Sequence, residues 1–185
     1  MLLMKHKTDK VWLCFIIVAV TLFLVITSQN VLVFCQNDMQ VKQYKIENLK
    51  IEQMEYTLTK AEIKNIVSNL YNTPHVYIET NDLPSYQNGI SHIVARIVKI
   101  KSNLSPLEYA MAYAHELTHV KYQVADETYT MYKTFTTLYE SGNKELQNMA
   151  LKDAQSVIYG GYGRSEYDCG YQILEYLKIN CPEVL

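Results

Sequence analysis

A short stretch of the chain, residues 115 to 119, restricts the possible folds more than any other. It reads His-Glu-Leu-Thr-His, an HExxH pattern in a chain of 185 residues. Two histidines four positions apart point from one face of an α-helix, so the imidazoles of His115 and His119 can reach the same metal ion, with Glu116 beside them. The pattern therefore predicts a helix that carries a metal site, with His115 and His119 as metal ligands.

The residues before the motif predict where this helix begins. Ser105 is a natural N-cap, Pro106 suits the first helical position, and Glu108 completes a capping box. Residues 109–114 carry no charge and no helix breaker, so the motif is expected in the second half of a mostly apolar, buried helix. Burying two histidines and a glutamate is unfavourable unless something pairs with them, and a metal ion would do so. The alternative is an amphipathic helix whose polar face matches the HExxH pattern by chance.

A catalytic zinc site needs a third protein ligand, and the acids after the motif are the candidates. No histidine follows His119, so the third ligand is expected to be a carboxylate. Glu127 is the first choice, because a tight turn at residues 122–125 would bring the next helix back with its first acids near His119. Asp126 is a close rival, although a carboxylate there would also compensate the helix dipole. Glu140 remains open as well, since it stands 21 residues beyond His119, near the separation in thermolysin-like enzymes.

The motif helix followed by an acid-bearing helix resembles a small gluzincin, a zinc metallopeptidase with two histidine ligands and one glutamate ligand. The resemblance covers residues 90–141 at most. It implies that His115, His119 and Glu127 bind Zn2+ and that Glu116 is the general base for hydrolysis of a peptide bond. The expected partner is a protein or peptide substrate that pairs in extended form with the strand before the motif helix.

The remaining pattern predicts an α+β, mostly helical domain of the zincin-like type with a small sheet. A capping box at Thr59 and Glu62 begins a helix that continues to residue 71. Residues 75–80 and 90–100 are rich in β-branched side chains and predict two strands, as antiparallel neighbours. Further helices are expected at residues 126–141, 143–158 and 165–177.

The first 35 residues differ in kind from the rest and predict a membrane anchor. Three lysines among the first ten residues precede an apolar run from Val11 to Ile26. Counting Val31 to Phe34 brings the segment, residues 11–34, to the about 20 residues that a spanning helix needs. The lysines place the N-terminus in the cytoplasm, so a single-pass membrane protein with an extracytoplasmic catalytic domain is expected. A cleaved signal peptide is the alternative, although no small-residue cleavage site is present.

Three segments are thus predicted: a cytoplasmic tip and transmembrane signal anchor at residues 1–35, a stalk at 36–58, and a zincin-like catalytic domain at 59–185. A formal net charge of -2 makes nucleic acid an unexpected partner. Cys169 and Cys181 flank the last predicted helix, and a continuous helix would hold them about 18 Å apart, too far for a disulfide. The oligomeric state is left open by the sequence.

The function expected from these features is that of a membrane-anchored zinc metallopeptidase. A second interpretation, from a different class, is a non-catalytic surface or interaction protein that retains a zincin-like fold. A third is a zinc hydrolase acting on a non-peptide amide. Substitution of Glu116 separates the first two, because the enzyme would lose turnover while retaining its metal.

Overall fold

The computed structural model describes residues 49–160 and 169–185 of the chain. All the elements described below belong to one compact unit. In chain order they are α2 (Lys60–Tyr71), β1 (Val76–Thr80), β2 (Gly89–His92), β3 (Ile97–Lys101), α3 (Pro106–Tyr122), α4 (Glu127–Tyr139), α5 (Lys144–Gly160), α6 (Gly170–Asn180) and the 3-10 helix η2 (Pro182–Val184).

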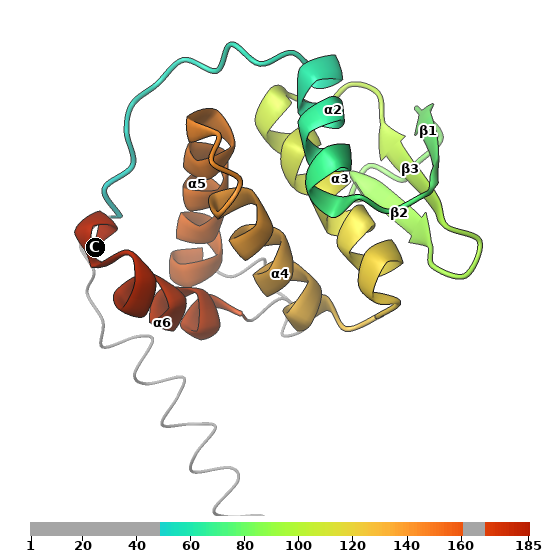
Figure 1. Cartoon of the computed structure of the whole chain (residues 1–185). Helices are drawn as coiled ribbons and strands as arrows, with labels where there is room; N and C mark the ends of the chain where they lie inside the picture. Colours follow the sequence, from blue (N-terminus) through green and yellow to red (C-terminus); the bar gives the residue numbers. More distant parts are fainter. Residues whose placement is uncertain (1–48, 161–168) are drawn as a thin grey trace, which may run out of the picture. The chain divides into compact units, whose positions relative to one another are not determined.

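Helix α3, which carries the HExxH motif, is the element around which the others pack. It contacts α2, strands β2 and β3, and helices α4 and α5 (Figure 1). Ser105 and Glu108 form the predicted capping box, with the backbone N–H of Ser105 donating to the Glu108 carboxylate at 2.8 Å. Tyr113 and Leu117 of α3 are fully buried. The packing of these side chains fixes the rotation of α3 and thereby the direction in which the motif residues point.

The sheet has three strands in the order β1-β3-β2, with β1 parallel and β2 antiparallel to the central strand β3. The prediction of one strand over residues 90–100 is therefore wrong, because this stretch folds into β2, a turn at 93–96 and β3. The predicted antiparallel pairing of residues 75–80 is also wrong, because β1 runs parallel to β3. Among the described residues no further strand pairs with β1 or β2, so the two outer strands leave two sheet edges open to other partners.

The turn between β2 and β3 explains why one long strand was predicted. Its residues are Ile-Val-Ala-Arg, without the glycine, proline, asparagine or aspartate that usually indicate a turn. Arg96 takes the left-handed conformation, with φ of 53°. The β-branched residues of this stretch would suit a continuous strand, but burial of Val98 and Ile100 against α3 selects the hairpin.

The predicted fold class and localisation require correction. The sequence predicted an α+β, zincin-like domain behind an N-terminal transmembrane helix, and hence a single-pass membrane protein attached through residues 11–34. Within residues 49–160 and 169–185, no helix is both long and apolar enough to cross a membrane. The α-helices there have 11 to 17 residues, whereas a spanning helix needs about 20, and their apolar side chains pack into a shared core. The fold class with a spanning helix and the single-pass localisation are thus wrong for the chain as described, and residues 11–34 lie outside the described part.

Residues 49–58 form an extended segment, here called the strap, that runs from the C-terminal end of the fold to α2 (Figure 1). At its start the N–H of Lys50 donates to the Val184 carbonyl at 2.7 Å. Further along, Asn148 donates to a strap carbonyl at 2.8 Å, and the Glu145 carboxylate accepts two backbone N–H groups at 2.9 and 3.0 Å. These residues, predicted as the end of a stalk, therefore pack as part of the fold.

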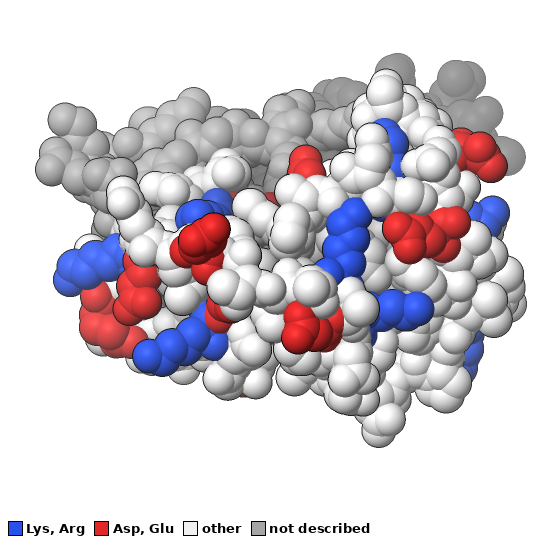
Figure 2. Space-filling model, turned by 90° about the horizontal axis from the view of Figure 1, so that it is seen from above, with Lys and Arg blue, Asp and Glu red and all other residues white. Residues whose placement is uncertain are grey.

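Charged side chains of both signs are interspersed on the face of the molecule seen in Figure 2. Lysine and arginine side chains lie next to aspartate and glutamate side chains there, and neither kind covers a continuous area. The described part of this face thus carries no extended surface of a single charge.

Candidate metal centre

A cleft of about 730 Å³ lies between strand β2, the loop before it, and helices α3 and α4. One stripe of α3 lines this cleft, with side chains repeating at the three- and four-residue spacing of a helix face. The stripe consists of Leu107, Glu108, Met111, Ala112, His115, Glu116 and His119. The HExxH motif therefore faces a cleft in the described structure.

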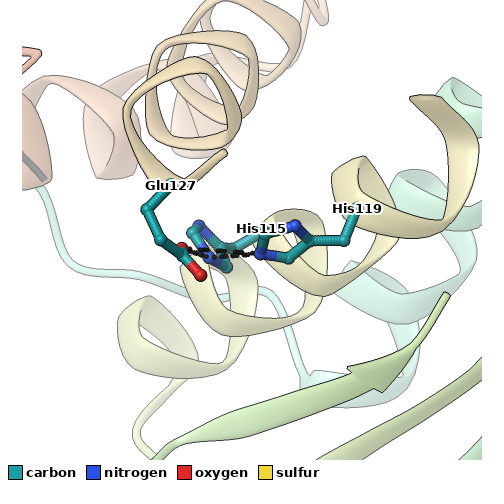
Figure 3. A group of neighbouring side chains, drawn as sticks. All are labelled: His115, His119 and Glu127. Atoms are coloured by element: carbon teal, nitrogen blue, oxygen red, sulfur yellow. Dashed lines mark hydrogen bonds and ion pairs between the residues drawn. The ribbon is translucent and has the colours of Figure 1, made fainter. Parts of the chain in front are cut away.

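Three side chains of the motif helix and the next helix converge at one side of the cleft. Figure 3 shows His115 and His119 from α3 and Glu127 from the first turn of α4 pointing toward one another. His115 Nε2 lies 3.0 Å from Glu127 Oε2, His119 Nε2 lies 3.1 Å from His115 Nε2, and His119 Nε2 lies 3.5 Å from Glu127 Oε2. These three residues thus present two imidazole nitrogens and one carboxylate oxygen to a common point.

The short connection between α3 and α4 brings Glu127 to this point. Helix α3 ends at Tyr122, its C-cap Gln123 takes the left-handed conformation with φ of 54°, and α4 already begins at Glu127. Asp126 is the N-cap of α4, and its carboxylate accepts the Tyr129 N–H at 2.7 Å. Asp126 therefore caps the N-terminus of α4, and the side chain of Glu127 is left to turn toward the histidines.

The structure also separates the rival carboxylate Glu140 from the histidines. Glu140 is the C-cap of α4 and accepts the hydroxyl of Tyr176 at 2.6 Å. Because it stands thirteen residues after Glu127 on one helix, it lies about 20 Å further along the helix axis. Of the three carboxylates considered from the sequence, only Glu127 belongs to the group with His115 and His119.

A backbone carbonyl orients the second histidine. His119 Nδ1 lies 2.7 Å from the Val124 carbonyl oxygen. A carbonyl can only accept, so the Nδ1–H of His119 donates, and in the neutral ring Nε2 then carries the lone pair that faces Glu127 and His115. Metal-binding histidines in proteins are usually held by such a hydrogen bond from the other ring nitrogen. The connection that positions Glu127 therefore also sets the tautomer of His119.

The pKa values of Glu127 and His119 favour a positive charge beside Glu127. Hydrogen bonds from His115 and, with its ring protonated on both nitrogens, from His119 lower the pKa of Glu127 to about 2. Burial works to lower the pKa of His119, but the hydrogen bonds to Glu127 and to the Val124 carbonyl outweigh it and raise that pKa. The arrangement thus stabilises a carboxylate next to a cationic species, which a proton or a metal ion can supply.

Glu116, the predicted base, lies against strand β2. It is only 8% exposed, and this burial raises the pKa of its carboxyl, while the nearby His115 and a hydrogen bond from Ser91 oppose the rise. A Cβ atom at Gly89 would lie 2.8 Å from Glu116 Cγ and 2.9 Å from a side-chain carbon of Ile100. Only glycine therefore lets β2 approach Glu116 this closely.

Gly89 and Ser91 were missed by the sequence interpretation. Asn88-Gly89 has the composition of a turn, which points away from a strand. The strand was also expected to start only at residue 90 and to continue to residue 100, so no helix contact was assigned to Ser91. Nothing in the local sequence indicates that these two residues meet Glu116.

Comparison of the chain with models of known protein families, with curated proteins and with solved structures finds no match. The resemblance to gluzincins therefore rests on the motif and the acid after it, and the function has to be argued from the geometry of the cleft.

Proposed function

We propose that this protein is a zinc-dependent metallopeptidase of the gluzincin type, with His115, His119 and Glu127 as zinc ligands and Glu116 as the general base. The observation that carries the proposal is the convergence of the two Nε2 atoms and Glu127 Oε2 beside a buried glutamate and an open strand edge, all on one cleft.

The spacing of the three ligand atoms supports zinc. Zinc binds imidazole nitrogen at about 2.0–2.1 Å and carboxylate oxygen at about 2.0–2.2 Å, usually in a tetrahedron, whose ligand atoms are then about 3.3–3.5 Å apart. The three distances here, 3.0, 3.1 and 3.5 Å, lie close to these edges. Two imidazoles and one carboxylate are also a ligand set found in catalytic zinc sites, which keep the fourth position for water. Only small movements would let the three side chains hold a zinc ion.

Glu116 and the Val124 carbonyl have further roles in this proposal. A bound zinc ion would polarise a substrate carbonyl and make a water molecule easier to deprotonate. Glu116 is held next to the ligands by its place on α3 and by Ser91, in reach of such a proton. The Val124 carbonyl keeps the His119 ring oriented. In this proposal residues of α3 bind the metal ion and accept a proton, and the α3–α4 connection orients the ring of His119.

The open edge of β2 supports an extended peptide as the substrate. Lys101 N–H donates to the Asn88 carbonyl at 3.0 Å, so the backbone groups of residue 88, and by the alternation of antiparallel pairs those of residue 90, face β3. The N–H and C=O groups of Gly89 and Ser91 then face the open edge. A peptide strand can pair with these groups while its carbonyl approaches Glu116 and the ligand group.

Metal content tests the ligand assignment. The full chain, saturated with zinc and dialysed, should hold about one zinc per chain by elemental analysis. His119→Ala and Glu127→Gln should each lose it, because they remove a ligand. Glu140→Gln is the matched control, since it changes a glutamate at the other end of the same helix, and it should retain the metal. Zinc binding that is indifferent to Glu127→Gln would refute the ligand set.

Glu116→Gln tests the catalytic role. The variant should bind zinc as the parent chain does and lose at least about a hundredfold of its activity on a mixed peptide library, the scale that general-base catalysis contributes. Retained zinc with no activity in the parent chain would instead favour the non-catalytic binding protein. Activity that survives Glu116→Gln would contradict the assigned base.

A further inference from the structure

The outer edge of β1 is the second open edge of the sheet, at the opposite side from β2. Among the described residues the strand paired with β1 is β3. Val76 and Ile78 point from the face of β1 turned away from α3 and are 56% and 37% exposed. The strand itself reads Val-Tyr-Ile-Glu-Thr and has neither the lysine nor the proline that commonly protects an exposed edge. Such an edge is suited to pairing with another strand.

Two hydrogen bonds show which backbone groups of β1 face this open edge. The N–H of Val76 donates to the Arg96 carbonyl at 2.8 Å, and the carbonyl of Thr80 accepts the Ser102 N–H at 3.0 Å. Since the backbone groups of alternate residues point to the same side of a strand, residues 76, 78 and 80 face β3. The N–H and C=O groups of Tyr77 and Glu79 therefore face outward.

We propose that the β1 edge pairs antiparallel with the β1 edge of a second copy of this chain, about a two-fold axis at Ile78. With this centre Tyr77 lies opposite Glu79 of the partner subunit, and both residues carry outward-facing backbone groups. This Tyr77–Glu79 pair occurs twice by symmetry, and the two pairs together form four backbone hydrogen bonds. Between them Ile78 lies opposite its own copy, in a pair without hydrogen bonds whose Cα atoms are closely spaced. The two sheets then join into one of six strands.

Charge complementarity favours a second copy as the occupant of this edge. Lys64 Nζ lies 3.7 Å from the centre of the Tyr77 ring, so a positive charge stands on the face of β1 that carries Tyr77 and Glu79. Among the described residues no ion pair joins Lys64 to Glu79 within one chain. In the antiparallel pair Glu79 of the partner subunit lies opposite Tyr77 and beside Lys64, twice by symmetry. Exposed ion pairs add little free energy, but they fix the register of an interface.

This pairing is independent of the proposed function. It uses the β1 edge and leaves the β2 edge open for a peptide, so a dimer would carry two separate clefts. The outcome for metal and activity does not decide the outcome for the dimer.

Cysteine cross-linking in the full chain tests the register. Ile78→Cys places two thiols opposite each other, whereas in Val76→Cys the two thiols are four residues out of register, about 13 Å apart. A disulfide needs Cα atoms within about 7 Å, so Ile78→Cys should give roughly tenfold more covalent dimer than Val76→Cys under mild oxidation. Val76 is the matched control because it lies on the same face and is the more exposed of the two. The parent chain gives the background from its own cysteines.

A charge exchange tests the partner. In the Ile78→Cys chain, Lys64→Glu should reduce the covalent dimer several-fold, because it sets two acids side by side, and adding Glu79→Lys should restore it. Equal cross-linking at positions 76 and 78, no dimer at either, or no restoration by the charge exchange would overturn the proposal. The edge would then be unpaired or bound by a different protein.

Discussion

Replacing Gly89 by alanine should displace Glu116. The new Cβ atom would lie 2.8 Å from Glu116 Cγ and 2.9 Å from Ile100 Cδ1, whereas carbon atoms in contact prefer about 3.5–4.0 Å. Ile100 is fully buried and has no room to withdraw. Strand β2 and the Glu116 side chain must therefore separate by roughly 0.7–1.2 Å, the difference between these distances.

The cost of this separation can be measured as a free energy of unfolding. Adding a methyl group to a packed site costs about 1–3 kcal/mol, and alanine recovers about 0.4–1 kcal/mol by restricting the unfolded chain. The net loss expected for Gly89→Ala is thus between about 0 and about 2.6 kcal/mol. Urea unfolding of chelator-treated protein measures it without a contribution from bound metal.

Gly142→Ala is the control for Gly89→Ala. Gly142 has φ of +75° and open space around it, so alanine there should lose about 1–2 kcal/mol through backbone strain alone. Both variants should keep the zinc content of the parent chain, but only Gly89→Ala should reduce peptide turnover. A Gly89→Ala chain that is more stable than the parent, by the roughly 0.4–1 kcal/mol expected from the unfolded chain alone, would refute the close approach of β2 to Glu116.

Three further predictions concern stability. Burial raises the pKa of Tyr71 to about 12, so the stability that its neutral hydroxyl contributes is complete below pH 10 and falls by about 1 kcal/mol per pH unit from there to pH 12. Tyr71→Phe should lose about 1 kcal/mol of stability at pH 7, because the hydrogen bond to Thr118 is gone. In urea titrations at increasing pH, this variant should also lose less stability above about pH 10 than the parent chain does. Ser105→Ala removes the N-cap of α3 and should lower the melting temperature by the equivalent of about 1 kcal/mol, whereas Ser105→Asp should not. Asn148→Ala removes the hydrogen bonds to the strap, so amide exchange should accelerate in residues 49–58 and stay unchanged in α3.

The sequence predicted those features whose causes are local. The capping box of Ser105 and Glu108 was visible because its donors and acceptors lie within four residues of one another. The position of Glu127 was accessible for a similar reason, since a four-residue connection leaves the next helix few directions. Both features depend on backbone geometry that neighbouring residues determine.

The sequence did not predict features that depend on distant contacts. The division of residues 90–100 into β2 and β3 depends on packing against α3, and its turn contains no residue typical of a turn. The role of Gly89 depends on a helix that begins seventeen residues later. The membrane-spanning helix at residues 11–34 was predicted from composition alone, and these residues lie outside the described part of the chain.

The candidate ligands have a consequence for the order of folding. His115, His119 and Glu127 lie within thirteen residues on the α3–α4 hairpin, so bringing them together closes only a short loop and loses little chain entropy. Contacts of such low sequence separation form early in folding. The surroundings of Glu116 assemble later, because strand β2 must dock from 27 residues away. Zinc added during refolding should therefore accelerate formation of the hairpin, and the ligand group should exist before the wall of the cleft around Glu116 is complete.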